Sequence, residues 1–149
     1  MTERSATQTF PRRDADGRVI SLKELLVAVA VGTLLGLAAL ALIDGIFSLI
    51  GLGNFGHASG WLTAILPIFL FVDDFRGWKR VGGGRRWIVA AIGLAVALTV
   101  GLIAASLVSR LPAILSGCVG ALVFALFYTI IWYVWIRWLS GQTTTGDAA

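Results

Sequence analysis

The sequence predicts an all-α polytopic membrane protein, a four-transmembrane-helix bundle with both termini in the cytoplasm. Two features of the chain lead to this prediction. Of its 149 residues, 58% are hydrophobic and only 13% are charged, which is far more apolar than a soluble domain of this size. Four long apolar stretches also follow one another, and lysines and arginines are concentrated in alternate connections between them.

Residues 1–21 are interpreted as a basic, flexible cytoplasmic arm, because they show neither helical nor strand periodicity. The first span is predicted over residues 22–44. Ser21 can cap this helix, with Glu24 three residues later completing a capping-box pattern. The arginines of the arm are Arg4, Arg12, Arg13 and Arg18.

The second span is the least regular of the four. Residues 45–60 are rich in glycine and hold no lysine or arginine, so they are predicted to lie outside the cytoplasm as a loop, an interfacial helix or a re-entrant segment. The cleanly apolar run that follows is too short to cross a bilayer, so the span is predicted over residues 55–72. Pro67 falls near the middle of that range, where a helix kink is expected.

The third and fourth spans are predicted over residues 87–108 and 113–138. Pro112 suits the first turn of the fourth helix, which leaves a tight turn at Arg110. The transmembrane domain therefore covers residues 22–139, and residues 140–149 are predicted to be a flexible cytoplasmic tail.

The basic residues set the predicted orientation. Their concentration in the arm and in the loop after the second span places both on the cytoplasmic side of a plasma membrane. The composition suggests a bacterial inner membrane. The loop is expected to contact anionic headgroups rather than nucleic acid, since no continuous basic stripe with stacking aromatics is present. Its basic residues are Arg76, Lys79, Arg80, Arg85 and Arg86.

Small residues at four-residue spacing predict close helix packing, which is what holds inserted helices together in lipid. The third span carries the longest such stripe, and the first span carries a shorter one. We interpret both as intramolecular packing faces, with a homodimer through the third span as the alternative. The stripe residues are Gly32, Gly36, Gly93, Ala97, Gly101 and Ala105.

Asp44, His57 and Arg110 are predicted to form a polar cluster at the outer end of the bundle. An Asp44–His57 pair could relay protons, because histidine titrates near physiological pH. An Asp44–Arg110 pair would instead only join two helix ends, and this is the interpretation we favour.

No catalytic, cofactor or metal site is predicted. Asp73 and Asp74 resemble the start of a metal site, but no further carboxylate follows before Asp147, so an oxygen-rich cage cannot be assembled. The two aspartates are expected to pair with Arg76, Lys79 or Arg80. Cys118 is the only cysteine, which excludes an intramolecular disulfide.

These observations predict a non-enzymatic accessory, scaffold or interaction subunit of a membrane assembly. Its partners would be the lipid bilayer and either another membrane protein or further copies of the chain. The alternative is a small oligomeric channel or transporter for protons, ions or small solutes that uses the outer polar cluster. A membrane enzyme that acts on a lipid-linked substrate is the least favoured class.

Overall fold

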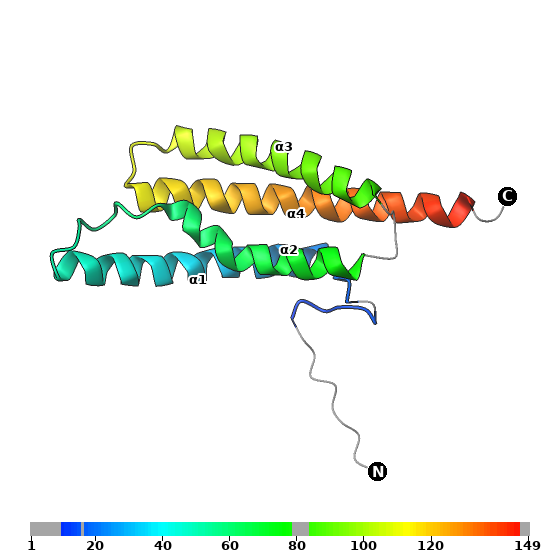
Figure 1. Ribbon diagram of the computed structural model, residues 1–149, viewed down its shortest axis with the longest axis horizontal. Helices are drawn as coiled ribbons and strands as arrows, with labels where there is room; N and C mark the ends of the chain where they lie inside the picture. The colour runs from blue at the N-terminus through cyan, green and yellow to red at the C-terminus, as the bar shows by residue number, and fades with distance from the viewer. Residues whose placement is uncertain (1–9, 16, 79–83, 147–149) are drawn as a thin grey trace, which may run out of the picture.

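The computed structural model describes residues 10–15, 17–78 and 84–146, with side chains described as far as residue 138. This part of the chain is all-helical, as predicted. Figure 1 shows α3 and α4 lying side by side and antiparallel, with α1 and α2 forming a second layer. The elements in order are α1 (Leu22–Leu49), the 3-10 helix η1 (Gly60–Ala64), α2 (Ile65–Gly77), α3 (Arg85–Leu107) and α4 (Ala113–Gly146).

Three of these helices are long and apolar enough to cross a membrane: α1, α3 and α4 over Ala113–Trp138. Most of their large apolar side chains are exposed rather than buried. Large apolar surfaces of this kind are rare on soluble proteins and are expected where the solvent is lipid. The structure therefore indicates a membrane protein.

The first helix ends later than predicted, at Leu49 instead of residue 44. Gly51 provides the physical reason, because its positive φ of 76° allows the chain to close the helix end. The Gly51 N–H donates to the Ser48 carbonyl at 3.2 Å, and the Leu52 N–H donates to the Phe47 carbonyl at 2.8 Å. These two bonds form a Schellman motif, so Asp44 lies within the helix.

The second predicted span is divided between η1 and α2. Residues 55–59 are not helical, and the helical part runs from Gly60 to Gly77. Pro67 is the third residue of α2, in a first turn where its missing N–H is not needed. The chain changes direction between η1 and α2 (Figure 1), so the bend precedes Pro67 instead of lying at the centre of a long helix.

The last two helices begin within two residues of their predicted starts. The α4 backbone continues as a helix to Gly146, beyond the predicted end of the span and through most of the predicted tail. The end of α2, the start of α3 and residues 17–21 before α1 lie at one end of the bundle (Figure 1), which we call the terminal end. Residues 50–59 and 108–112 connect the helices at the opposite end, the loop end.

The stripe on α3 packs against α4. Gly93, Ala97 and Gly101 are buried. A methyl group at Gly101 would approach the Gly120 carbonyl oxygen and the Phe124 Cβ to 2.8 Å each. This α3 face is therefore covered within the chain.

Trp61 of η1 explains why glycine stands on both sides of this contact. A methyl group at Gly120 would lie 2.7 Å from the Trp61 ring, and one at Gly101 would lie 3.2 Å from it. The indole also contacts the Phe124 ring, with 6.3 Å between centroids. Small residues on two helices thus make room for one large ring from a third element.

The stripe on α1 packs against the second layer in the same way. A methyl group at Gly36 would approach the Thr63 carbonyl oxygen to 2.9 Å, and one at Gly32 would touch Pro67 at 3.7 Å. Gly60 and Gly117 bring the backbones of η1 and α4 together, since a methyl group on either residue would collide with the other chain segment. Such close approach is how small residues hold helices together in lipid.

Candidate functional site

Asp74 is the most deeply buried charged residue in the described part of the chain, with 3% of its surface exposed. It lies in the last turn of α2, at the terminal end. One carboxylate oxygen accepts the Val19 N–H at 3.0 Å, and the other accepts the indole N–H of Trp132 at 2.7 Å. A single side chain thereby connects the segment before α1 with α2 and α4.

Further bonds hold the same segment to the helix ends. Nη2 of Arg137 donates to the Val19 carbonyl at 2.8 Å, and the Tyr133 hydroxyl donates to the Ile20 carbonyl at the same distance. Arg18 donates through Nε to the Gly77 carbonyl at 3.3 Å, and its guanidinium carbon lies 4.6 Å from the centre of the Trp78 ring.

The segment can reach this position because it folds back on itself. We call residues 12–20 the terminal hairpin; residue 16 lies outside the described part. The Gly17 N–H donates to the Asp14 carbonyl at 3.0 Å, and Gly17 has a φ of 82°, which favours glycine. The Asp14 side chain accepts the Arg18 N–H at 2.8 Å, and Arg13 pairs with Val19 in an antiparallel bridge.

An ion pair connects the hairpin with the start of α1. Nη2 of Arg12 lies 2.6 Å from Oε1 of Glu24, and the Arg12 backbone N–H donates to Oε2 at 2.8 Å. The hydrogen bond and the charge of Glu24 raise the pKa of Arg12. Glu24 therefore contacts the hairpin through an exposed ion pair instead of completing a capping box with Ser21, whose side chain makes no cap hydrogen bond.

These contacts differ from two sequence-based expectations. Residues 12–15 and 17–20, part of the segment interpreted as a flexible arm, form a segment with ordered contacts to three helices; residues 1–9 and 16 lie outside the described part. Asp74 was expected to pair with Arg76, Lys79 or Arg80, but it binds Val19 and Trp132 instead. Lys79 and Arg80 also lie outside the described part.

At the loop end, the sequence predicts that an Asp44–Arg110 pair joins two helix ends. In the structure, the Gly56 backbone connects two helices there. The Gly56 N–H donates to Oδ2 of Asp44 at 2.5 Å, and the Gly56 carbonyl accepts the Ile114 N–H at 3.2 Å. This residue thus joins α1 to α4. Its φ of 90° and its contact with Pro112 leave little room for a side chain.

His57 and Arg110 come together at the loop end, where both line a hollow of about 430 Å³. Asp44 is not among the lining residues. Among the described residues, no ion pair joins Asp44 to His57 or Arg110. The structure therefore brings two of the three predicted cluster residues to one hollow and ties the third to the Gly56 backbone.

A larger hollow of about 630 Å³ lies at the terminal end between α2 and α3, with α4 behind it. Its walls are apolar and aromatic except for Arg76 and Arg86. Nε and Nη1 of Arg86 are buried and have no hydrogen-bond partner among the described residues. Its guanidinium carbon lies 4.8 Å from the centre of the Phe75 ring. We call this hollow the α2–α3 groove.

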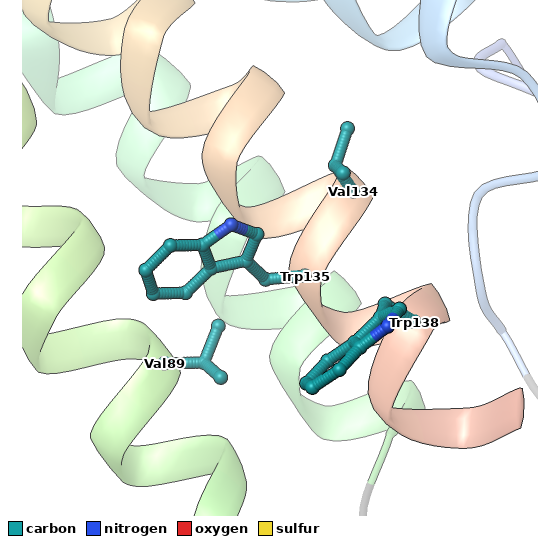
Figure 2. Close-up of a pocket in the computed structure, with 4 residues that line it drawn as sticks. All are labelled: Val89, Val134, Trp135 and Trp138. Atoms are coloured by element: carbon teal, nitrogen blue, oxygen red, sulfur yellow. The ribbon is translucent and has the colours of Figure 1, made fainter. Parts of the chain in front are cut away.

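A third hollow, of about 450 Å³, lies between α3 and α4. Figure 2 shows the Trp135 ring extending from α4 toward Val89 of α3, with Trp138 further along α4. Val134 completes the lining. Trp135 and Trp138 are exposed, as suits rings at a membrane interface. Trp132, in contrast, is 1% exposed and donates its indole N–H to Asp74.

The buried threonine side chains of the described helices are satisfied locally. The hydroxyls of Thr33, Thr63 and Thr129 are buried and donate to carbonyls of their own helices at 2.7–2.9 Å. Across the described residues, no group of three histidine, cysteine or carboxylate side chains could hold a metal ion. Comparison with known protein families, with curated proteins and with solved structures gives no match.

Proposed function

We propose that the protein is a non-catalytic subunit of a membrane assembly, and that the terminal hairpin with the adjoining ends of α2 and α4 is its docking face. The observation that carries this proposal is the use of Asp74. A buried carboxylate is costly unless it is well bonded, and here it fixes the backbone of a surface segment. An ordered surface of this kind lowers the entropy cost of binding a partner.

The docking face also has a recess with suitable chemistry. A hollow of about 380 Å³ lies between the hairpin and the end of α2, lined by Arg13, Gly17, Asp73, Arg76 and Gly77. Its two guanidinium groups outnumber the one carboxylate of Asp73, so the recess favours an acidic side chain of the partner, which arginine binds through charge-assisted hydrogen bonds. The small-residue faces are less suitable for docking, since they are packed within the chain.

For the topology we propose four spans in a plasma membrane, with both termini in the cytoplasm. Besides the three long helices, the remaining span, second in chain order, would be η1 with α2. The five residues of η1 extend about 10 Å and the 13 residues of α2 about 20 Å, which together match a hydrocarbon core of about 30 Å. The orientation is supported by the basic residues of the terminal end, where arginines are frequent and the loop end has only Arg110.

Cysteine labelling tests this topology. Single cysteines at the exposed positions Ala15 and Leu52 would be treated with a membrane-impermeant maleimide. The native Cys118 is 6% exposed, so its background labelling should be low. We expect Leu52→Cys to react in intact cells and Ala15→Cys to react only after the cells are opened. Labelling of both cysteines in intact cells would contradict the proposed orientation.

The subunit function is tested by mild extraction of the full chain from its native host into lipid nanodiscs, followed by mass spectrometry of the intact particles. We expect a second protein in fixed stoichiometry with the wild type and with Asp44→Asn. Asp74→Asn, the same substitution at the other end of the bundle, should release that protein. Retention by both variants would contradict docking at the hairpin face.

The alternative function is transport of protons, ions or small solutes by an oligomer of this chain. The observation that favours it is the hollow that His57 and Arg110 share at the loop end. A homo-oligomer in the same nanodisc experiment, together with flux into liposomes that Asp44→Asn abolishes, would support this class. An enzyme that acts on a lipid-linked substrate has the least support, because the described residues that line these four hollows include no group of three side chains that could hold a metal ion and no acid placed beside a base.

A further inference from the structure

The α2–α3 groove combines an apolar channel with a guanidinium group, that of Arg86, two of whose nitrogens have no hydrogen-bond acceptor among the described residues. It is lined along α2 by Ile68, Phe71, Val72 and Phe75, and along α3 by Trp87, Ala90 and Leu94. Its volume of about 630 Å³ lies within the usual range of small-molecule sites. Since α2 and α3 make few direct contacts, the groove opens between two membrane-embedded helices.

Arg86 gives this groove a preference for negative charge. Two of its guanidinium nitrogens are buried without an acceptor among the described residues, and the ring of Phe75 is a weak substitute. Arg76 lies across the groove in the last turn of α2 and adds a second positive charge. A group that combines an anion with a long apolar chain would satisfy both parts of the site.

We propose that the α2–α3 groove binds one anionic phospholipid from the leaflet at the terminal end of the bundle. An acyl chain occupies the apolar channel between α2 and α3. The phosphate lies at the groove mouth, and a rotation of the Arg86 side chain toward the mouth lets its buried nitrogens donate to phosphate oxygens, with Arg76 as the second cation. Guanidinium groups suit phosphate because they present several donors in a fixed plane.

A specific lipid site in the groove differs from a general attraction of the basic loop to the membrane surface. Arg85 and Arg86 are neighbours with the same charge, but Arg85 is exposed and does not line the groove. Diffuse attraction would make the two residues equivalent, since each contributes one charge near the surface. A specific site makes only Arg86 important.

The experiment is a titration of the delipidated full chain in detergent with phosphatidylglycerol or phosphatidylcholine, read by native mass spectrometry. We expect one phosphatidylglycerol to bind the wild type at least tenfold more tightly than phosphatidylcholine. Arg86→Gln should weaken phosphatidylglycerol binding tenfold or more, and Arg85→Gln should weaken it less than twofold. Equal loss in the two variants, or equal affinity for the two lipids, would overturn the proposal.

A second pair of variants tests the apolar channel without changing any charge. Leu94→Trp fills the groove, whereas Leu98→Trp places the same ring one turn further along α3 at an exposed position outside it. Leu94→Trp should weaken phosphatidylglycerol binding at least tenfold, and Leu98→Trp should leave it unchanged. Circular dichroism confirms that each variant folds. An unchanged affinity in well-folded Leu94→Trp would show that the chain does not enter the groove.

Discussion

Replacing Trp132 with phenylalanine should release the terminal hairpin from the helix ends. The substitution keeps an aromatic ring but removes the N–H that donates to Asp74 at 2.7 Å, so a 3% exposed carboxylate loses one of its two bonds. A hydrogen bond to a charged group contributes about 1.5–3 kcal/mol. Undocking removes the Val19 N–H and lets water reach Asp74, so the Trp132 bond contributes its full strength only while the hairpin is docked. Its loss should therefore raise the undocked fraction of the hairpin by at most roughly 10- to 150-fold.

Trypsin cleavage of the Arg18–Val19 bond measures that fraction. Val19 is 2% exposed and its N–H is bound to Asp74, so the bond can be cleaved only after the hairpin undocks. When docking is fast relative to cleavage, the cleavage rate follows the undocked population. We expect Trp132→Phe to accelerate cleavage at this bond in nanodiscs by at most roughly that 10- to 150-fold factor.

Trp135→Phe is the matched control, because Trp135 is exposed and lines only the hollow between α3 and α4 (Figure 2). Its cleavage rate should equal that of the wild type. Asp74→Asn should behave like Trp132→Phe, since its amide turns a donor toward one of the two N–H groups. Equal rates for Trp132→Phe and Trp135→Phe would refute the role assigned to Asp74.

Three further substitutions test other contacts, each by thermal unfolding in detergent. Gly101→Leu should cost about 1–3 kcal/mol by overpacking against α4, whereas Gly84→Ala, with open space around it, should cost much less; equal losses would contradict the packing argument. Gly56→Ala should cost about 1–3 kcal/mol, because a side chain is strained at a φ of 90°; an unchanged melting temperature would contradict the claim that this position requires glycine. Glu24→Gln should leave the melting temperature nearly unchanged, since its partner Arg12 is well exposed; a large drop would show that the hairpin depends on this pair.

The apolar pattern is sufficient to predict the helices that consist of one long hydrophobic run. The starts of α3 and α4 follow from hydrophobic runs, and Pro112 marks the turn between them. The apolar pattern does not predict the end of α1, because Asp44 and Gly45 interrupt the hydrophobic run without interrupting the helix. The signal that decides it is Gly51, the first glycine able to form the closing turn with a positive φ.

The start of the second span could not be predicted because packing decides it. Gly60 begins the helical segment where its backbone meets Gly117, and Trp61 enters the space between Gly101 and Gly120. Hydrophobicity alone does not distinguish these contacts from exposure to lipid. The pattern of small residues did identify packing faces, but not which element each face would contact.

The Asp74 contacts were missed for a similar reason. Its donors come from positions 55 residues earlier and 58 residues later in the chain, so no local spacing reveals them. The turn that forms the hairpin did have a local signal, since aspartate followed three residues later by glycine is typical of turns. The flexible-arm interpretation depends on the lack of helical or strand periodicity, and such a short turn creates neither.

Photo-crosslinking in native membranes tests the proposed docking face most directly. A photoreactive residue at Ala15 would lie in the terminal hairpin, and one at Leu52 would lie at the loop end, where 71% of the side chain is exposed. We predict one protein adduct of constant mass from Ala15 and none from Leu52. Adducts in equal yield from both positions, or none from Ala15, would contradict the proposal that this face binds a partner.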